Sequence, residues 1–397
     1  MGTFPDEVSI ASLCVIPSGR DSAWPDPVAS LHTRYETTPM KRILVCLDGT
    51  WNESGKTETD TDTNVFKLFQ KAQKHDGASQ VSTYIAGVGT AIFERVTGGL
   101  FGFGLYDQIK EGYQFIVNEY KPGDQVIVIG FSRGAYSARC LAGFVATCGV
   151  LKERLVDFGD FRDRRAINEL WDLYKDRADR PAALAEFRSR ECHPLDAKIV
   201  SAVGVWDTVG SLGIPWEIFE TDKFAARLNE KERRLLAFLD TELPAGVAKG
   251  YHAVALDEQR VPFIPTLWTG PRLNDGTIHQ VWFAGSHSNV GGGFPNTGLS
   301  DITLDWMIRR LRGTHGLDVD NVELKPDGLW QTIDLTSMDK AFGKLPIEKV
   351  RLLKPREVPA DSLLHTTADL RINGTTGRPP VPSHAKFLGS YKVDKNH

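Results

Sequence analysis

The chain has 397 residues, of which 41% are hydrophobic and 25% charged, and its 47 Lys and Arg against 51 Asp and Glu give a net charge of −4. This composition is that of a globular protein, so a disordered chain is excluded, and so is a general attraction to nucleic acid or anionic lipid. Since no stretch reaches the roughly 18 apolar residues of a membrane span and the N-terminus lacks the pattern of a secretory signal, we expect a cytoplasmic protein without a transmembrane segment.

Short apolar runs alternate with helical patterns from residue 40 onward, after a Pro-, Ser- and Asp-rich stretch at 1–39 that we interpret as an irregular extension. The runs predict strands at 41–48, 81–85, 125–130, 197–206 and 280–284. Between them, helices are predicted at 64–75, at 106–120, from about 135, and at 301–311, with a Gly-rich loop at 87–104. This alternation predicts an α/β fold, with a mostly parallel sheet flanked by helices.

We expect a single domain over 40–397, with helical cap insertions at about 151–195 and 214–250. The five cysteines are odd in number and lack CxxC or zinc-type spacing, so we expect no disulfide framework, no metal and no cofactor. They are Cys14, Cys46, Cys140, Cys148 and Cys192.

The strongest motif is Gly130-Phe131-Ser132-Arg133-Gly134, a GxSxG pentapeptide between a buried strand and a predicted helix. In a nucleophile elbow the serine occupies a sharp strand-to-helix turn, and glycines at Gly130 and Gly134 allow strand and helix to approach closely. The alternative is a tight turn with an incidental serine. The position of the motif favours a nucleophilic Ser132.

A general base for this serine is best assigned to His287, which follows the predicted strand 280–284 and precedes three glycines. His252 and His279 are the rivals. His252 is expected in a helix or loop, and His279 at the start of a strand, which is the wrong end. Four other histidines lie in polar or terminal stretches and are expected at the surface: His32, His75, His315 and His397.

The orienting acid is best assigned to Asp207, which directly follows the apolar strand ending at Trp206. Asp257 is the rival acid, and a structural loop role is expected for it. The chain order Ser132, Asp207, His287 is that of the α/β hydrolases rather than of the chymotrypsin or subtilisin types. The sequence therefore predicts an α/β-hydrolase-like fold with these three residues at one edge of the sheet.

The loop after the first strand is the expected source of one oxyanion donor. We predict that the backbone N–H groups of Thr50 and Arg133 form the oxyanion hole, with Asp48, Gly49 and Asn52 supporting the loop. The alternative is a simple strand-terminating turn. The apolar residues of the Gly-rich loop, Leu100, Phe101 and Phe103, either pack over the core or line a pocket for an acyl chain. Trp216, in the later cap insertion, is a further candidate for lining that pocket.

Six ordered segments carry a family resemblance: KRILVCLDGTWN, NVFKLF, IGFSRGAYSARCLAGFV, VGVWDTVGSLG, YHAVALDEQR and VWFAGSHSNVGGGF. Over about residues 41–310 the chain resembles the DUF2235 α/β hydrolases, which include the catalytic domain of one class of type VI secretion phospholipase effectors. The resemblance implies Ser132, Asp207 and His287 as the triad. It also implies an ester substrate, with lipid and phospholipid acyl esters among the candidates.

Two alternatives from other classes stay open. The first is a binding or scaffold protein that kept the hydrolase fold without activity. The second is a phosphatase of the haloacid-dehalogenase type, because LDGT resembles that family's DxDGT loop. That route needs an aspartate nucleophile at position 46, where this chain has Cys46.

Overall fold

The computed structural model describes residues 40–49, 62–87, 101–152, 161–210, 241–333 and 354–395, with the backbone alone at 101–104, 161–164 and 262. All of them belong to one compact unit, Pro39–His397. The expected extension at 1–39 lies outside the described residues.

The centre of this unit is an eight-stranded sheet in the order β10-β8-β6-β5-β4-β3-β1-β2, and all of its neighbouring strands are parallel. Its strands are β1 (Arg42–Leu47), β2 (Gln80–Ile85), β3 (Gln125–Phe131), β4 (Val200–Trp206), β5 (Val247–Ala255), β6 (Ile278–Phe283), β8 (Leu363–His365) and β10 (Lys392–Asp394). A second, two-stranded sheet pairs β7 (Glu357–Val358) with β9 (Lys386–Phe387).

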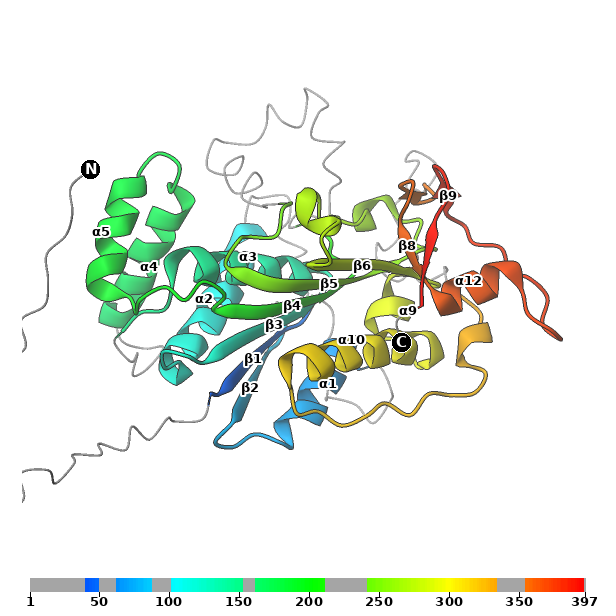
Figure 1. Ribbon diagram of the computed structural model, residues 1–397, viewed down its shortest axis with the longest axis horizontal. Coiled ribbons are helices and arrows are strands. Elements are labelled where there is room, and N and C mark those ends of the chain that lie inside the picture. The colour runs from blue at the N-terminus through cyan, green and yellow to red at the C-terminus, as the bar shows by residue number, and fades with distance from the viewer. Residues whose placement is uncertain are drawn as a thin grey trace, which may run out of the picture. The chain divides into compact units, whose positions relative to one another are not determined.

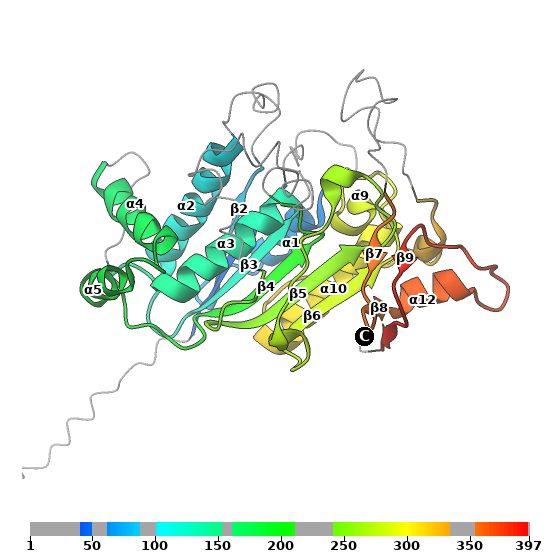
Figure 2. The same cartoon turned by 90° about the horizontal axis from the view of Figure 1, so that it is seen from above.

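Helices flank the sheet on both faces (Figures 1 and 2). They are α1 (Asn64–Gln73), α2 (Phe101–Glu119), α3 (Arg133–Cys148), α4 (Phe161–Lys175), α5 (Pro181–Glu191), α9 (His287–Gly291), α10 (Gly298–His315) and α12 (Thr366–Asn373). Short 3₁₀ turns occur at Val261–Phe263, Pro271–Leu273 and Gly328–Trp330. Among the described residues, no helix combines the length and apolar character needed to cross a membrane.

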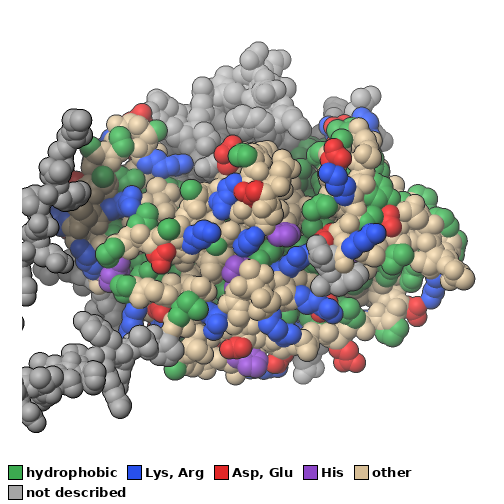
Figure 3. Space-filling model, in the orientation of Figure 1, with side chains coloured by type: hydrophobic (Ala, Val, Ile, Leu, Met, Phe, Trp, Pro, Cys, Tyr) green, Lys and Arg blue, Asp and Glu red, His purple; other side chains and the backbone are tan. Residues whose placement is uncertain are grey.

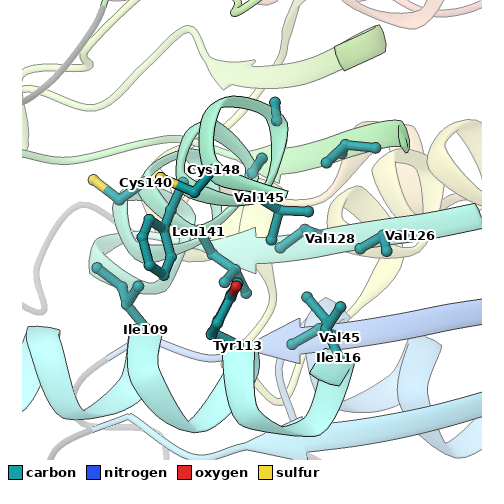
Figure 4. Close-up of a cluster of buried hydrophobic side chains, with 14 of the residues drawn as sticks. Val45, Ile109, Tyr113, Ile116, Val126, Val128, Cys140, Leu141, Val145 and Cys148 are labelled. Carbon is teal, nitrogen blue, oxygen red and sulfur yellow. The ribbon is translucent and has the colours of Figure 1, made fainter. Parts of the chain in front are cut away.

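Alternate residues of the central strands supply two separate hydrophobic cores, because successive side chains of a strand point to opposite faces. On one face, Val45 and Val128 pack with α2 and α3 (Figure 4). On the other, Cys46 and Ile129 pack with α1 and α10. Both faces are thus covered, which explains the continuous apolar runs RILVCL and QVIVIGF.

The two expected helical insertions have different outcomes. Helices α4 and α5 lie within the first, at 151–195, and α4 packs on α3 through contacts of Trp171 and Tyr174 with Phe144. Of the second, residues 211–240 lie outside the described residues. Its last residues belong to the sheet, because β5 begins at Val247.

Three other expectations need correction. Residues 101–104 form the first turn of α2 rather than the end of a loop. The expectation of a helix or loop around His252 is wrong, since this residue lies within β5. The last strand that the sequence predicts lies at 280–284, but the region after α10 contributes two further strands to the main sheet, β8 and β10.

The carboxyl ends of the central strands lie level with one another. In the register, Leu47 pairs with Gly130 and Phe131 pairs with Trp206. Trp206 in turn pairs with Ala253.

On the described part of the face in Figure 3, lysine and arginine side chains are scattered among acidic and uncharged ones. The chemistry-bearing side chains gather instead at the carboxyl edge of the sheet.

Candidate active site

Ser132 occupies a sharp turn between β3 and α3. Its backbone has φ 59° and ψ −122°, a conformation that non-glycine residues rarely adopt. The turn is held by hydrogen bonds: Ser132 N donates to Trp206 O (3.1 Å), and Ser132 O accepts from Tyr136 N and Val209 N (3.3 Å each). Such a conformation costs about 1–3 kcal/mol and persists where the surroundings fix it, often at functional sites.

The two glycines of the motif are required by close packing. A Cβ on Gly130 would lie 2.3 Å from the backbone oxygen of Gly134. A Cβ on Gly134 would lie 2.2 Å from the backbone oxygen of Leu47, the last residue of β1. Any side chain at either position would therefore push α3 away from the sheet.

His287 is the first residue of α9, directly after the loop that leaves β6. Its Nδ1 lies 2.6 Å from Asp207 Oδ2, and its backbone N–H donates to Glu258 Oε2 (3.1 Å). The imidazole contacts the rings of Phe131 and Phe263, with centroid distances of 4.5 and 4.7 Å. Burial lowers the pKa of His287, and the carboxylate of Asp207 opposes this effect.

Asp207 directly follows β4 and is fully buried, with φ 39°. Both of its carboxylate oxygens are fully engaged. Oδ1 accepts hydrogen bonds from Ala255 N (2.9 Å) and Arg356 Nη1 (2.5 Å), and Oδ2 accepts from His287 Nδ1 (2.6 Å) and Arg356 Nη2 (2.8 Å). Burial raises the pKa of Asp207, but Arg356 and His287 outweigh burial and hold it well below its usual range.

The structure brings His287 together with Asp207 and not with Asp257. The Asp257 carboxylate accepts hydrogen bonds from Gly285 N (2.7 Å), Ser383 Oγ (2.7 Å) and His384 N (2.9 Å). It therefore ties the loop before His287 to the C-terminal part of the chain, a structural role like the one expected for it.

Two neighbouring residues that the sequence analysis did not single out support the His287 loop. Glu258 forms a buried ion pair with Arg260 (2.7 Å) while it accepts the backbone N–H of His287. Arg260 also lies over the ring of Phe263, 3.9 Å from its centroid. Both residues lie in the loop that follows β5, so prediction of that strand from the sequence would have pointed to this loop.

The loop after β1 begins beside the nucleophile. A Cβ on Gly49 would lie 3.0 Å from Ser132 Cβ. Asp48 supports the loop by accepting hydrogen bonds from Gly49 N (2.7 Å), Thr63 Oγ1 (2.6 Å) and Tyr84 Oη (2.8 Å).

Position 46, where a haloacid-dehalogenase-type phosphatase needs its nucleophile, is a cysteine side chain buried in the core. Four predicted site residues, Thr50, Asn52, Leu100 and Trp216, lie outside the described residues. Phe101 and Phe103 lie in the first turn of α2, where only the backbone is described.

Of the other histidines named in the sequence analysis, His32 and His397 lie outside the described residues, and His75 is exposed, as expected. His252 Nε2 accepts from Thr208 N (3.2 Å), its Nδ1 lies 3.0 Å from Gln280 Oε1, and burial lowers its pKa to about 3. His279 lies at the start of β6, at the end of the sheet away from Ser132, as expected. The expectation of a surface position for His315 is wrong, because this residue is buried against Tyr251.

Among the residues that the structure describes, no group of three or more His, Cys, Asp or Glu is arranged to hold a metal ion. The parallel sheet, the strained serine turn between β3 and α3, and a His–Asp pair after the carboxyl ends of β6 and β4 define an α/β-hydrolase fold.

The chain belongs to the family of Tle1-like phospholipase effectors of the type VI secretion system, whose catalytic-domain model matches residues 41–310. This membership makes the matched region a hydrolase domain of the esterase and lipase type. Arg356 lies beyond the matched residues.

Individual similarities are more distant. The chain is 27% identical to the uncharacterized protein YEL023C of Saccharomyces cerevisiae, over 60% of this chain and 36% of that protein. An uncharacterized protein from Pseudomonas aeruginosa shares 17% identity at a TM-score of 0.39, over 75% of this chain and 49% of the other. The Tle1 effector bound to the VgrG spike shares 20% at a TM-score of 0.35, over 64% and 51%. The chain thus spans about half or less of the length of each.

Proposed function

We propose that this protein hydrolyses carboxylic esters, with Ser132 as nucleophile, His287 as general base and Asp207 as the orienting acid. The observation that carries the proposal is the 2.6 Å contact between His287 and Asp207 at the strand edge where the strained Ser132 turn also lies. Since Nδ1 of the imidazole bonds Asp207, Nε2 is the nitrogen left to take a proton.

In the proposed reaction, Ser132 Oγ attacks the ester carbonyl carbon while its proton passes to His287 Nε2. The tetrahedral intermediate collapses, the bond to the leaving oxygen breaks, and His287 returns the proton to the departing alcohol. Water then attacks the acyl-enzyme, with His287 again accepting and returning a proton, so that a carboxylic acid and free Ser132 result.

The negative charge on the carbonyl oxygen is assigned to two backbone donors. One is Arg133 N–H, at the first residue of α3, where the positive end of the helix dipole adds to the effect. The other is Thr50 N–H, in the loop that begins at Gly49 beside Ser132. Loss of one such donor lowers the rate by about 10²–10³-fold in serine hydrolases.

Phospholipid acyl esters are the substrate class that we propose. The support is the family description, which is that of a phospholipase effector. A shorter, water-soluble ester is the alternative, and the two differ in the acyl chain that the site must accommodate.

Labelling with a fluorophosphonate probe tests the nucleophile. The wild-type protein is expected to react and Ser132→Ala is not. Ser137→Ala is the matched control, because Ser137 is a buried serine further along α3 that hydrogen-bonds Gln108 Oε1 (2.7 Å), and it should label normally. An unlabelled wild-type protein would support the inactive scaffold, and a labelled Ser132→Ala would overturn the nucleophile assignment.

The substrate class is tested with p-nitrophenyl esters of increasing acyl length and then with phosphatidylcholine vesicles. Release of fatty acid from the vesicles by the wild-type protein but not by Ser132→Ala is the expected result. Hydrolysis of short esters alone would overturn the phospholipid substrate and leave the esterase chemistry standing.

A further inference from the structure

Arg356 reaches the candidate active site from the C-terminal part of the chain, 149 residues after Asp207. It lies just before β7 and is buried, with 5% of its surface exposed. The family model ends at residue 310, so neither the family match nor any sequence motif pointed to this side chain.

The guanidinium hydrogen-bonds the Asp207 carboxylate through both of its terminal nitrogens. Nη1 donates to Oδ1 (2.5 Å) and Nη2 to Oδ2 (2.8 Å), which is the bidentate geometry typical of arginine and carboxylate pairs. The same nitrogens also donate to the backbone oxygens of Ala255 and Phe263. Arg356 thereby joins the end of β5 and the following turn to the acid.

The four hydrogen bonds to Asp207 fill the positions at which a carboxylate accepts donors. His287 and Arg356 share Oδ2, while Ala255 and Arg356 share Oδ1. The carboxylate therefore has no freedom to rotate about its last bond without losing donors, and the imidazole bonded to it is fixed in turn.

The charges around His287 come from three parts of the described chain. Asp207 follows β4, the Glu258–Arg260 pair follows β5, and Arg356 precedes β7. With a neutral imidazole, these two acids and two arginines balance. Without Arg356, the pair of His287 and Asp207 would carry an unbalanced buried negative charge, which favours protonation of the imidazole.

We propose that Arg356 is a positioning residue of the active site: it holds the Asp207 carboxylate in the orientation that aligns His287, and its charge keeps the imidazole unprotonated and ready to act as a base. The role in catalysis rests on the proposed function. The effect on the imidazole is a property of the folded protein and is measurable without any substrate.

Two substitutions separate the charge of Arg356 from its shape. Arg356→Gln removes the charge, and Arg356→Lys keeps the charge but lacks the planar, bidentate hydrogen-bond donor. Arg371→Gln is the matched control, because Arg371 is a buried arginine of the same region that donates to the backbone oxygens of Leu329 and Gln331 rather than to a carboxylate.

The first measurement is a titration of the His287 Nδ1 proton, followed by its downfield proton NMR signal. Since guanidinium and imidazole bond the same oxygen, Arg356 lies within the range of about 4–6 Å at which a charge shifts a pKa by about 1–3 units. We expect the imidazole pKa to rise by about that amount in Arg356→Gln and to stay near the wild-type value in Arg356→Lys and Arg371→Gln.

The second measurement is the pH profile of ester hydrolysis. The acidic limb of kcat/KM should move to higher pH in Arg356→Gln, because a more basic imidazole is protonated at higher pH. In Arg356→Lys the limb should stay in place, while kcat falls about 10–100-fold from misalignment and KM is unchanged.

An unchanged imidazole pKa in a folded Arg356→Gln would overturn the proposal. So would a result in which Arg356→Gln and Arg371→Gln both lose stability and neither changes the imidazole pKa or the pH profile. If Arg356→Gln does not fold, the kcat of Arg356→Lys tests the positioning role, and a wild-type kcat in that variant would overturn it. If the protein proves to lack esterase activity, the NMR titration still tests the control of the imidazole by Arg356.

Discussion

Replacement of Asp207 by asparagine is expected to lower both stability and activity, for one structural reason. Each carboxylate oxygen accepts two donors, and an asparagine has only one oxygen and one NH₂ group. In either orientation, the new N–H groups therefore face two donors. The guanidinium of Arg356 also stays buried without its counter-charge.

The expected losses are large. Removal of one partner from a buried ion pair costs about 3–5 kcal/mol of unfolding free energy. Loss of the orienting acid of a Ser–His–Asp triad lowers kcat by about 10⁴-fold. For Asp207→Asn we expect the unfolding loss in urea denaturation and the catalytic loss in hydrolysis of a p-nitrophenyl ester.

Asp257→Asn is the matched control for this experiment. Asp257 is as deeply buried as Asp207 and accepts three hydrogen bonds, but its partners are Gly285, Ser383 and His384. This variant should lose stability with a far smaller loss of kcat. The reasoning is refuted if Asp207→Asn unfolds at the wild-type urea concentration, or if it keeps more than about a tenth of the wild-type kcat.

Three further outcomes are expected. Gly130→Ala should destabilise the fold by about 1–3 kcal/mol or more through its clash with Gly134. Gly313→Ala in α10 should stabilise the fold by about 0.5–1 kcal/mol, because the new Cβ meets no atom within 4 Å apart from its chain neighbours and its own helix backbone. Equal urea midpoints for the two variants would contradict this expectation. His252 has a folded pKa of about 3, so the unfolded state binds more protons below about pH 6.5 and stability should fall as the pH is lowered. His252→Gln should weaken that pH dependence in urea titrations, and an unchanged slope would argue against it. Because burial lowers the pKa of His287, the acidic limb of kcat/KM should have its midpoint below about pH 6.5, and a midpoint above that value would contradict the assignment.

The parallel sheet and the neighbourhood of the site could be predicted because the relevant signals are local. Ser132 and Asp207 each follow a continuous apolar run, and parallel strands bring their carboxyl ends to one edge. His287 lies four residues after the end of a third strand, β6. The roles of these three residues in catalysis stay predictions, which the experiments above test.

The missed elements lack such local signals. Strand β5 contains Lys249 and His252, so its sequence does not read as an apolar run, and only burial of His252 between Thr208 and Gln280 explains its place there. The role of Arg356 could not be predicted, because an ion pair between residues far apart in the chain leaves no periodic pattern in the sequence. Its burial becomes understandable only once the fold brings Asp207 to it.

The two strands that continue the sheet beyond β6 have a consequence for shortened versions of this protein. Strands β8 and β10 both follow residue 354, and β8 pairs with β6, the strand that leads to His287. A protein cut after residue 310 would leave β6 as a bare outer strand with unpaired backbone groups, which invites aggregation. Expression of the family-matched segment alone should therefore yield insoluble material, whereas a chain that extends through β10 should stay soluble.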